Sequence, residues 1–384
     1  MGTKPGANFL LKKIILLFIV SRLFFLGASQ IASRFVTVEK GYLGSQVAQG
    51  EPGFIWRLAN MDGRHYIWVA KDGYTGSNFA FFPLYPSLIG LVNGISGLTF
   101  IYSGILISVL ASLGAIYFIV KLIRLENEKA SVLEPIFLLL FFPLSFLLSS
   151  VYADALFLFF TTTTFYFARK KLWLICGVFA ALASLTRLTG LALIPALILE
   201  WWLQSNRPRL NLSTIKKYVH QAAIAPILNF LGFALYPLYL QLSYGNWQLF
   251  QTSMSAWKQD KFTTVITVIY RYIRIFLTVS PRLYVYWVAV LEFITFLLYF
   301  GLSIYVFRKI RASYGLFMMV LLLLVTFTGT FAGTPRYLLH LFPAYIGISV
   351  FLRRYPSFRF VYYPITLVLG AILATLFTQG YFIT

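Results

Sequence analysis

The chain has 384 residues, of which 59% are hydrophobic and only 11% are charged, and its mean hydropathy is +0.79. This composition excludes a water-soluble globular domain and predicts a polytopic membrane protein. Apolar stretches long enough to cross about 30 Å of hydrocarbon recur along the whole sequence. We therefore expect a single all-α membrane domain over residues 1–384.

The formal net charge of +21 comes from 32 Lys and Arg residues against 11 Asp and Glu residues. A basic chain can bind nucleic acid, but these cations occur in small clusters between apolar segments, which is the pattern of membrane topology signals. No nucleic-acid partner is therefore expected. The single cysteine, Cys176, excludes an internal disulfide and a cysteine metal cluster.

Eleven transmembrane helices are predicted in chain order. The first is expected to be a retained span rather than a removed signal peptide, because the small-residue cleavage pattern after it is weak. Two long outer segments are expected at about 30–100 and 244–282. The predicted spans are residues 9–29, 101–120, 132–149, 153–168, 172–186, 188–204, 220–243, 284–307, 314–332, 338–352 and 360–379.

The basic clusters predict the orientation of these spans. With a cytoplasmic N-terminus, every cytoplasmic turn carries several cations, as the positive-inside rule requires. If the apolar run at 79–98 also crossed the bilayer, three clusters would face outward, so we expect a re-entrant or interfacial helix there. The predicted cytoplasmic cations are Lys4, Lys12, Lys13, Lys121, Arg124, Lys129, Arg169, Lys170, Lys171, Arg207, Arg209, Lys216, Lys217, Arg308, Lys309, Arg311, Arg353, Arg354 and Arg359.

The first outer segment concentrates rare ionisable residues in "ANMDGRHYIWVAKDGYTGSNFAFFPLYP" at 59–86. Asp62 is either a capping or surface carboxylate, or a group that faces a reactant carried by a lipid. His65 either packs at the interface or orients an acceptor hydroxyl. Aromatic residues are expected to hold this segment against the headgroup region. They are Trp56, Tyr66, Trp68 and Tyr74.

Further charges fall at predicted outward turns or inside spans. Asp154, in "SSVYADALFLFF", is either a first-turn residue favoured by the helix dipole or a second acid of the same outward cavity. Arg187 and Arg336 lie at outward turns and Arg22 lies inside the first span, where a cation is costly unless it is paired or hydrated. Each arginine is either structurally paired or available to grip a phosphate. Paired carboxylates on one side suit general-base chemistry.

Several motifs are absent from the sequence, including a P-loop, a dinucleotide-binding glycine motif and a D-x-D metal motif. The histidines His65, His220 and His340 are too far apart to form a recognisable metal motif. We therefore predict no metal site and assign no cofactor; a divalent metal would have to be held by carboxylates. A soluble nucleotide site is not expected, so an enzyme whose acids and arginines gather on the outer side would need an activated donor already in the membrane, which a lipid-linked phosphate sugar supplies.

The stretch "MDGRHYIWVAKDGYTGSNFAFFPLYP" resembles the first outer loop of the GT-C superfamily of membrane glycosyltransferases. The likeness is to the family of the second mannosyltransferase of glycosylphosphatidylinositol-anchor assembly and its prokaryotic relatives. The stretches "YADALF", "LTRLTGL", "GNWQLFQTSMSAW" and "TPRYLLHLFP" also fit, so the resemblance runs from about residue 15 to 350. The sequence departs from the family at Met61, where relatives have Trp.

This resemblance implies transfer of a sugar, normally mannose, from a polyprenyl (dolichyl-type) monophosphate donor, with inversion, to a glycan or glycolipid acceptor. It implies that Asp62 is the base and that Asp154 orients a substrate. Arg187 and Arg336, with Arg22 as a third candidate, would bind the donor phosphate. The site would face outward from a prokaryotic cytoplasmic membrane. Candidate residues of the substrate cavity are His65, Tyr66, Tyr74, Tyr85 and Trp257.

Two alternatives stay open. A transporter or flippase for a lipid-linked glycan would also use outward cations, but it would place ionisable groups near the midplane and on both sides. The same scaffold with a different sugar on polyprenyl phosphate would bind the phosphate in the same way.

The amphipathic "VIYRYIRIF" either anchors at the interface or covers the cavity, with Arg271 and Arg274 near the lipid headgroups.

Overall fold

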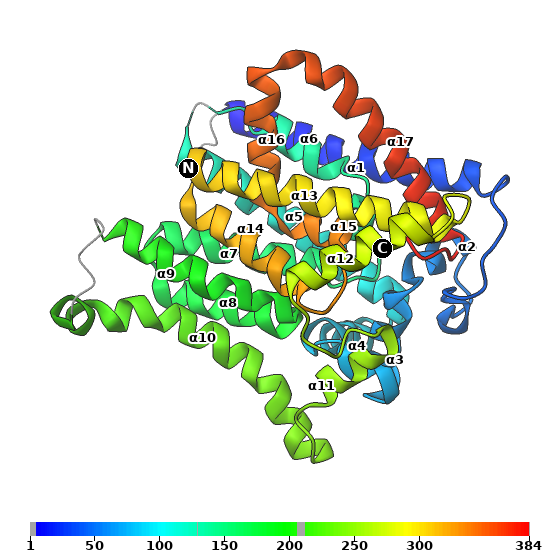
Figure 1. Ribbon diagram of the computed structural model, residues 1–384, viewed down its shortest axis with the longest axis horizontal. Helices are drawn as coiled ribbons and strands as arrows, with labels where there is room; N and C mark the ends of the chain where they lie inside the picture. Colours follow the sequence, from blue (N-terminus) through cyan, green and yellow to red (C-terminus); the bar gives the residue numbers. More distant parts are fainter. Residues whose placement is uncertain (1–4, 129, 206–211, 384) are drawn as a thin grey trace.

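Figure 1 shows the computed structural model, which describes residues 5–128, 130–205 and 212–383, with the side chains of 5–8 and 212–222 left undescribed. Throughout this described part every regular element is a helix, which confirms the all-α prediction. Some predicted topology signals and one histidine lie outside the described residues or side chains. They are Lys4, Lys129, Arg207, Arg209, Lys216, Lys217 and His220.

Each predicted span overlaps an α-helix of the described ranges, but the bounds differ, and α6 covers less than half of the predicted span 132–149. These helices are α1 (Pro5–Ala32), α5 (Phe100–Glu126), α6 (Leu133–Leu140), α7 (Asp154–Arg169), α8 (Trp173–Thr186), α9 (Leu193–Gln204), α10 (Leu212–Tyr244), α13 (Tyr284–Lys309), α14 (Ala312–Thr326), α16 (Phe342–Arg354) and α17 (Arg359–Thr378).

Shorter elements fill the predicted outer segments and the connections. The short α-helices are α2 (Gly53–Trp56), α3 (Asp62–Asp72), α4 (Leu84–Ser96), α11 (Leu249–Thr252), α12 (Val265–Thr278) and α15 (Thr334–Tyr337). The 3-10 turns are Ser45–Val47, Arg57–Ala59, Gly76–Ala80, Ser145–Ser149, Leu188–Ala192, Ser253–Trp257, Leu338–His340 and Pro356–Phe358.

Four segments of the described chain are long and apolar enough to cross a membrane, so the chain is a multi-pass membrane protein. They are Phe100–Glu126, Ala223–Tyr244, Tyr284–Lys309 and Pro356–Thr378. The helix α6 has only 8 residues, well short of the roughly 20 that a crossing requires. The topology of eleven crossings therefore stays a prediction.

The long helices lie side by side as a bundle, and the short helices α2, α3, α4 and α11 gather at one end of it (Figure 1). Both predicted outer segments thus meet at the same end. The helix α4 has 13 residues, which corresponds to about 20 Å and is shorter than the hydrocarbon layer. This length fits a re-entrant or interfacial helix, although its depth in a bilayer stays a prediction.

Small residues allow α8 and α10 to approach closely. A Cβ atom at Gly232 would lie 2.4 Å from the carbonyl oxygen of Ala181, and one at Gly177 would lie 2.6 Å from Cδ1 of Leu228. Close backbone contact through small residues is a common source of helix association in membranes. These two glycines therefore fix how α10 lies against α8.

Ion pairs join helices at the end opposite the outer segments. Buried Glu200 accepts hydrogen bonds from Arg311 Nε at 2.6 Å, which links α9 to the start of α14. Glu134 accepts from Arg353 at 3.1 Å and from Arg359 at 2.7 Å, which links α6 to α16 and α17. Several cations predicted as topology signals therefore also hold neighbouring helices together.

Candidate active site

Two acids begin helices at the same end of the bundle. Asp62 is the first residue of α3 and Asp154 is the first residue of α7. A carboxylate in the first turn is stabilised by the positive end of the helix dipole. Met61, which precedes α3, has φ of 57° and ψ of −119°, a conformation that costs a non-glycine residue about 1–3 kcal/mol. This backbone conformation fixes the direction in which α3 starts, and with it the position of the Asp62 side chain.

The position of Arg187 follows from a helical hairpin. Residues 170–172 join α7 to α8, so the N-terminus of α7 and the C-terminus of α8 lie together. Asp154 begins α7 and Arg187 is the C-cap of α8, where the helix dipole favours a cation. Arg187 Nη1 lies 3.4 Å from Asp154 Oδ2, and the guanidinium lies over the ring of Tyr337 at 5.0 Å.

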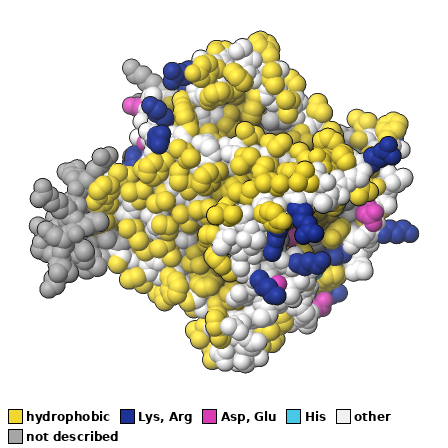
Figure 2. Space-filling view, in the orientation of Figure 1, with side chains coloured by type: hydrophobic (Ala, Val, Ile, Leu, Met, Phe, Trp, Pro, Cys, Tyr) yellow, Lys and Arg dark blue, Asp and Glu magenta, His cyan; other side chains and the backbone are white. Residues whose placement is uncertain are grey.

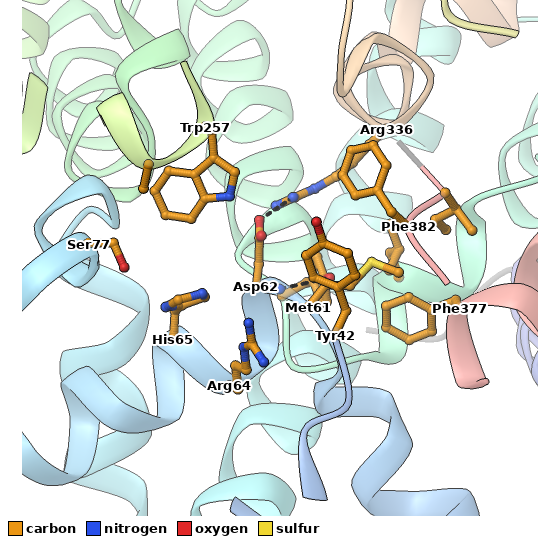
Figure 3. Close-up of a pocket in the computed structure, with 14 residues that line it drawn as sticks. Tyr42, Met61, Asp62, Arg64, His65, Ser77, Trp257, Arg336, Phe377 and Phe382 are labelled. Carbon is orange, nitrogen blue, oxygen red and sulfur yellow. Dashed lines mark hydrogen bonds and ion pairs between the residues drawn. The ribbon is translucent and has the colours of Figure 1, made fainter. Parts of the chain in front are cut away.

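Arg336, on the short helix α15, joins the two acids. Its Nε lies 3.1 Å from each carboxylate oxygen of Asp154, and its Nη2 lies 3.0 Å from Asp154 Oδ2. Its Nη1 donates to Asp62 Oδ2, and Figure 3 shows this contact. The structure thus brings together Asp62, Asp154, Arg187 and Arg336, four residues that the sequence analysis selected separately.

The two acids differ in their access to solvent and ligands. The Asp62 side chain is 29% exposed and lines a cavity, whereas the Asp154 side chain is 0% exposed and does not line it. His340 Nε2 lies 2.9 Å from Asp154 Oδ1 and completes the enclosure of this acid. Asp62 is therefore the carboxylate that a substrate can reach.

The cavity beside Asp62 has a volume of about 250 Å³ (Figure 3). This is close to the lower end of small-molecule sites, which measure about 300–1,000 Å³. Polar groups form one part of its wall, and aromatic and aliphatic side chains form the rest. The polar residues are Asp62, Arg64, His65, Ser77 and Arg336, and the others are Tyr42, Met61, Leu147, Tyr152, Ala256, Trp257, Phe377, Phe382 and Ile383.

Arg64 is the cation of this wall that the sequence analysis did not assign to the site. Its guanidinium lies 5.6 Å from the ring of Trp68, and among the described residues it has no hydrogen bond or ion pair. Asp62 and Asp154 balance the charges of Arg187 and Arg336. Arg64 therefore leaves the cluster with one uncompensated positive charge facing the cavity.

Charge interactions keep Arg336 ionised, whereas burial favours the neutral form of His65. Burial alone would lower the pKa of Arg336, but Asp154 and Asp62 together raise it well above its ordinary value. Burial lowers the pKa of His65, and the hydrogen bond to Asn78 and the charge of Asp62 offset this only in part. His65 Nδ1 donates to Asn78 Oδ1 at 2.7 Å, so Nε2 is left as a hydrogen-bond acceptor in the neutral ring.

Three predicted cavity residues pack in the interior instead of lining the cavity. The Tyr74 hydroxyl donates to the Phe81 carbonyl at 2.9 Å, and the Tyr85 hydroxyl donates to the Gly104 carbonyl at 3.0 Å. Tyr66 is buried against Phe81 and Tyr85, and burial raises the pKa of its phenol. These rings support the wall from behind, whereas His65 and Trp257 do line the cavity.

Arg22 lies apart from this cluster. Its guanidinium donates to the Leu140 carbonyl at 3.1 Å, the Ser145 carbonyl at 2.5 Å and the Ser149 hydroxyl at 3.3 Å. Leu140 is the last residue of α6, whose final carbonyls have no partner within the helix, and Ser145 and Ser149 belong to the 3-10 turn that follows. Arg22 shares no hydrogen bond or ion pair with Asp62, Asp154 or the other described residues of the cluster, so this geometry gives its predicted phosphate role no support.

Two residues that complete the site were missed in the sequence analysis. His340 holds Asp154, and Tyr152 carries the Arg336 guanidinium over its ring at 4.6 Å. The Tyr152 hydroxyl also accepts a hydrogen bond from the Asp62 backbone N–H at 3.3 Å. The available signal was their position next to selected residues, in "TPRYLLHLFP" and "SSVYADALF". In the part of the chain that the structure describes, no group of three or more His, Cys, Asp or Glu residues is arranged to hold a metal ion.

The fold and this cluster define a polytopic membrane protein with a charged candidate active site at one end of its bundle. The model of the family described as mannosyltransferase (PIG-V) matches residues 9–300. The chain belongs to this family of membrane mannosyltransferases and is therefore a glycosyltransferase. The matched range includes Asp62, Asp154 and Arg187, whereas Arg336 follows it. No curated protein matches the chain.

Proposed function

We propose that this protein transfers mannose from a polyprenyl (dolichyl-type) monophosphate to a hydroxyl of a glycan or glycolipid acceptor, with inversion at the anomeric carbon. The observation that carries this proposal is the pairing of Asp62 with Arg336 at the cavity wall. This pairing supports the proposal because a carboxylate that could act as a base and a guanidinium that could bind phosphate line the same cavity. The family match supports mannose as the sugar.

Asp62 acts as the general base. Its carboxylate takes the proton of the acceptor hydroxyl while the acceptor oxygen bonds to the anomeric carbon. The bond from that carbon to the phosphate oxygen breaks, and its electron pair stays on the phosphate. Attack from the face opposite the leaving phosphate inverts the anomeric centre. General-base catalysis of this kind contributes about 10²- to 10⁴-fold in rate.

The cations stabilise the phosphate as it leaves. Protonation of Asp62 removes the charge that holds Arg336 Nη1, so this group becomes available as the phosphate gains negative charge. Arg64 supplies the cation of the cavity wall that no described acid neutralises. A preorganised donor of this kind is worth about 3–4 kcal/mol in the transition state.

Asp154 is a positioning residue in this mechanism. Because it is fully buried, its carboxylate contacts Arg187, Arg336 and His340 rather than a substrate. It keeps Arg336 charged and oriented toward the cavity, and Arg187 belongs to the same supporting network. The aromatic wall gives sugar rings apolar faces to pack on, and His65 Nε2 accepts a hydrogen bond from a sugar hydroxyl.

We assign the site to the extracytoplasmic face of a prokaryotic cytoplasmic membrane. The basic turns lie at the opposite end of the bundle from α2, α3 and α4, and the positive-inside rule makes that end cytoplasmic. The donor lipid would then present its sugar from the outer leaflet, next to the headgroups.

The test is transfer of label from radiolabelled polyprenyl-phosphate-mannose in membranes that contain the full chain. Asp62→Asn keeps the side chain's shape but removes the base, so we expect transfer to fall about 10²- to 10⁴-fold. The matched control is Asp72→Asn at the other end of α3, where the exposed carboxylate lies outside the cavity. Equal transfer by Asp62→Asn and wild type would contradict the assigned base.

The same assay separates the two alternatives. A transporter would move the intact labelled lipid between leaflets without releasing polyprenyl phosphate. An enzyme for another sugar would leave the mannose donor intact and use a polyprenyl phosphate that carries a different hexose or pentose.

A further inference from the structure

Met61, the residue before the assigned base, has an unusual backbone conformation. It lines the cavity beside Asp62, which we call the catalytic cavity. Three non-glycine residues of the described chain have a positive φ, and they are Met61, Lys171 and Lys258. Lys258, with φ of 58° and ψ of 35°, lies in the ordinary left-handed helical region, whereas Met61, with φ of 57° and ψ of −119°, does not. A residue with a β-carbon keeps such a conformation only where its surroundings hold it there.

Asn60, directly before Met61, is fully buried. Hydrophobic side chains cover most of the visible face of the long helices (Figure 2), and a buried amide in so apolar a chain is costly unless it is hydrogen-bonded. The Asn60 side chain has partners on two distant segments. Its Oδ1 accepts from the Gly44 N–H at 2.9 Å, and its Nδ2 donates to the Phe377 carbonyl at 2.8 Å. These bonds hold the side chain between the first outer segment and the end of α17.

The backbone on both sides of Met61 is held as well. The Met61 N–H donates to the Tyr42 carbonyl at 3.0 Å. The Tyr152 hydroxyl donates to the Asn60 carbonyl at 3.1 Å and accepts from the Asp62 N–H at 3.3 Å. This hydroxyl thus contacts the residue before Met61 and the residue after it. Together with the Asn60 amide, it fixes the peptide groups that flank the strained position.

The two segments that this asparagine joins also contact each other. The Glu39 N–H donates to the Gln379 carbonyl at 2.8 Å. Gly380 follows with φ of 86°, and a Cβ atom there would lie 2.3 Å from the Glu39 carbonyl oxygen. The rings of Tyr42 and Phe382, with centroids 5.8 Å apart, both line the catalytic cavity (Figure 3). The first outer segment and residues 379–383 therefore form one wall, and the asparagine lies behind it.

We propose that Asn60 is a positioning residue for the assigned base: its amide holds Met61 in the strained conformation from which α3 starts, and so places the Asp62 carboxylate in the catalytic cavity. The proposal rests on the proposed function for the role of Asp62. Asn60 does not line the cavity, so it acts through Asp62 and not on a substrate. A misplacement of about 1 Å at a reacting group costs about 10²-fold in rate, so a residue behind the wall can limit turnover.

The test compares Asn60→Ala in two backgrounds. Met61→Ala removes the side chain from the cavity but keeps the β-carbon, so the backbone stays strained. Met61→Gly removes the β-carbon as well, and glycine adopts positive φ without strain. Transfer of label from radiolabelled polyprenyl-phosphate-mannose, at varied donor concentration, gives kcat and KM for each variant of the full chain.

In the Met61→Ala background, Asn60→Ala should lower kcat about 10- to 100-fold, because the strained backbone relaxes and displaces Asp62. The donor KM should change less than about threefold, since the loss falls on the transition state. In the Met61→Gly background the same substitution should lower kcat less than about threefold. Equal losses of kcat in the two backgrounds would overturn the proposal, and so would a rise in KM with kcat unchanged.

Unfolding midpoints in detergent give a second measurement, which needs no donor. Here the expected order is reversed: Asn60→Ala should lower the midpoint less in the Met61→Ala background, because relaxation of the strained backbone there recovers part of the lost stability. A residue with a merely structural role would lower both midpoints equally, and that result would contradict the proposal. If Asn60→Ala does not fold, Asn60→Asp replaces it in both backgrounds, since it keeps the acceptor for Gly44 and removes the donors to α17.

The matched control is Asn93→Ala. The Asn93 Nδ2 also donates to a backbone carbonyl, that of Leu98 at 2.6 Å, but it does so at the end of α4 and away from the catalytic cavity. This variant should change kcat less than about twofold in either background. A loss as large as that of Asn60→Ala would count against a specific role of Asn60.

The two proposals fail in different ways. A wild-type protein that transfers no mannose would remove the assigned reaction, and the midpoints would still test whether Asn60 holds Met61. Transfer by the wild type with equal losses of kcat in both backgrounds would keep the assigned reaction and remove the positioning role.

Discussion

At the residue scale, Asp62 and Asp154 start from the same local rule and end in different environments. Both occupy the first turn of a helix, where a carboxylate is favoured. Asp62 faces the cavity, while three partners enclose Asp154. Asp62 can therefore accept a proton from a ligand in the cavity, whereas Asp154 holds the arginine side chains in place.

We predict that Asp154→Asn destabilises the protein. The substitution leaves the guanidinium groups of Arg187 and Arg336 buried with one fewer counter-charge, and breaking a buried ion pair in this way costs about 3–5 kcal/mol. Thermal unfolding of the purified protein in detergent would show a lowered midpoint. Asp72→Asn, at an exposed position, should leave the midpoint unchanged; an unchanged midpoint for Asp154→Asn would mean that the buried network is not needed for stability.

Arg64→Ala should weaken binding of the donor. A hydrogen bond to a charged group contributes about 1.5–3 kcal/mol, so the KM for polyprenyl-phosphate-mannose is expected to rise about 10- to 100-fold. Steady-state kinetics with a varied donor concentration measure this change. Lys71→Ala removes a cation from the same helix without touching the cavity and serves as the control. A KM that does not move would show that the donor phosphate lies elsewhere.

At the scale of elements, α12 holds the loop 327–333, which leads into α15 and so to Arg336. The Tyr272 hydroxyl donates to Glu292 Oε2 at 2.5 Å and accepts from the Phe331 backbone N–H at 3.1 Å. Arg271 holds the same loop at Gly329. The loop then leads directly into α15, so α12 is linked to the position of Arg336.

Tyr272→Phe is expected to lower both stability and transfer. It leaves the buried Glu292 carboxyl without its hydroxyl donor, a loss worth about 1–3 kcal/mol, and frees the loop at Phe331. Unfolding midpoints and label transfer measure the two effects. Tyr270→Phe makes the same chemical change on the same helix at a side chain that is 64% exposed, so it should change neither. Identical behaviour of the two variants would argue against this brace.

At the scale of the whole molecule, each end of the bundle has its own group of acid–arginine pairs. Glu200 and Glu134 pair with arginines at one end, whereas Asp62 and Asp154 pair with arginines at the other. The first end also carries the basic turns that set orientation, so it is expected to face the cytoplasm.

Cysteine labelling tests this orientation. Thr75 and Ser357 are exposed at opposite predicted faces, and native Cys176 is buried, so the unmodified chain should give little background. We expect a membrane-impermeant maleimide to label Thr75→Cys in intact cells and to label Ser357→Cys only after permeabilisation. The reverse pattern would place the catalytic cavity on the cytoplasmic side.

The sequence was sufficient to identify the membrane class, the ranges of the long helices and the most informative charges. An ionisable residue such as Asp62 or Arg336 is costly in an apolar chain, so its presence alone indicates a role. The apolar periodicity likewise predicts where helices lie. The predicted span 132–149 overestimates the length of α6, although Pro143, three residues beyond Leu140, is a local signal for a helix end. The structure adds that Arg22, from another helix, binds the Leu140 carbonyl.

Only the tertiary structure decided which charges meet and which can be reached. Arg22 and Arg336 look alike in sequence, yet one caps a helix end and the other joins two acids at a cavity. Arg64 is a candidate for phosphate binding because no described acid lies close enough to form an ion pair with it. Tyr85 does not line the cavity, because its hydroxyl donates to the Gly104 carbonyl in the interior. Pairing and burial are properties of three-dimensional neighbours, and the residues that supply them lie far apart in the chain.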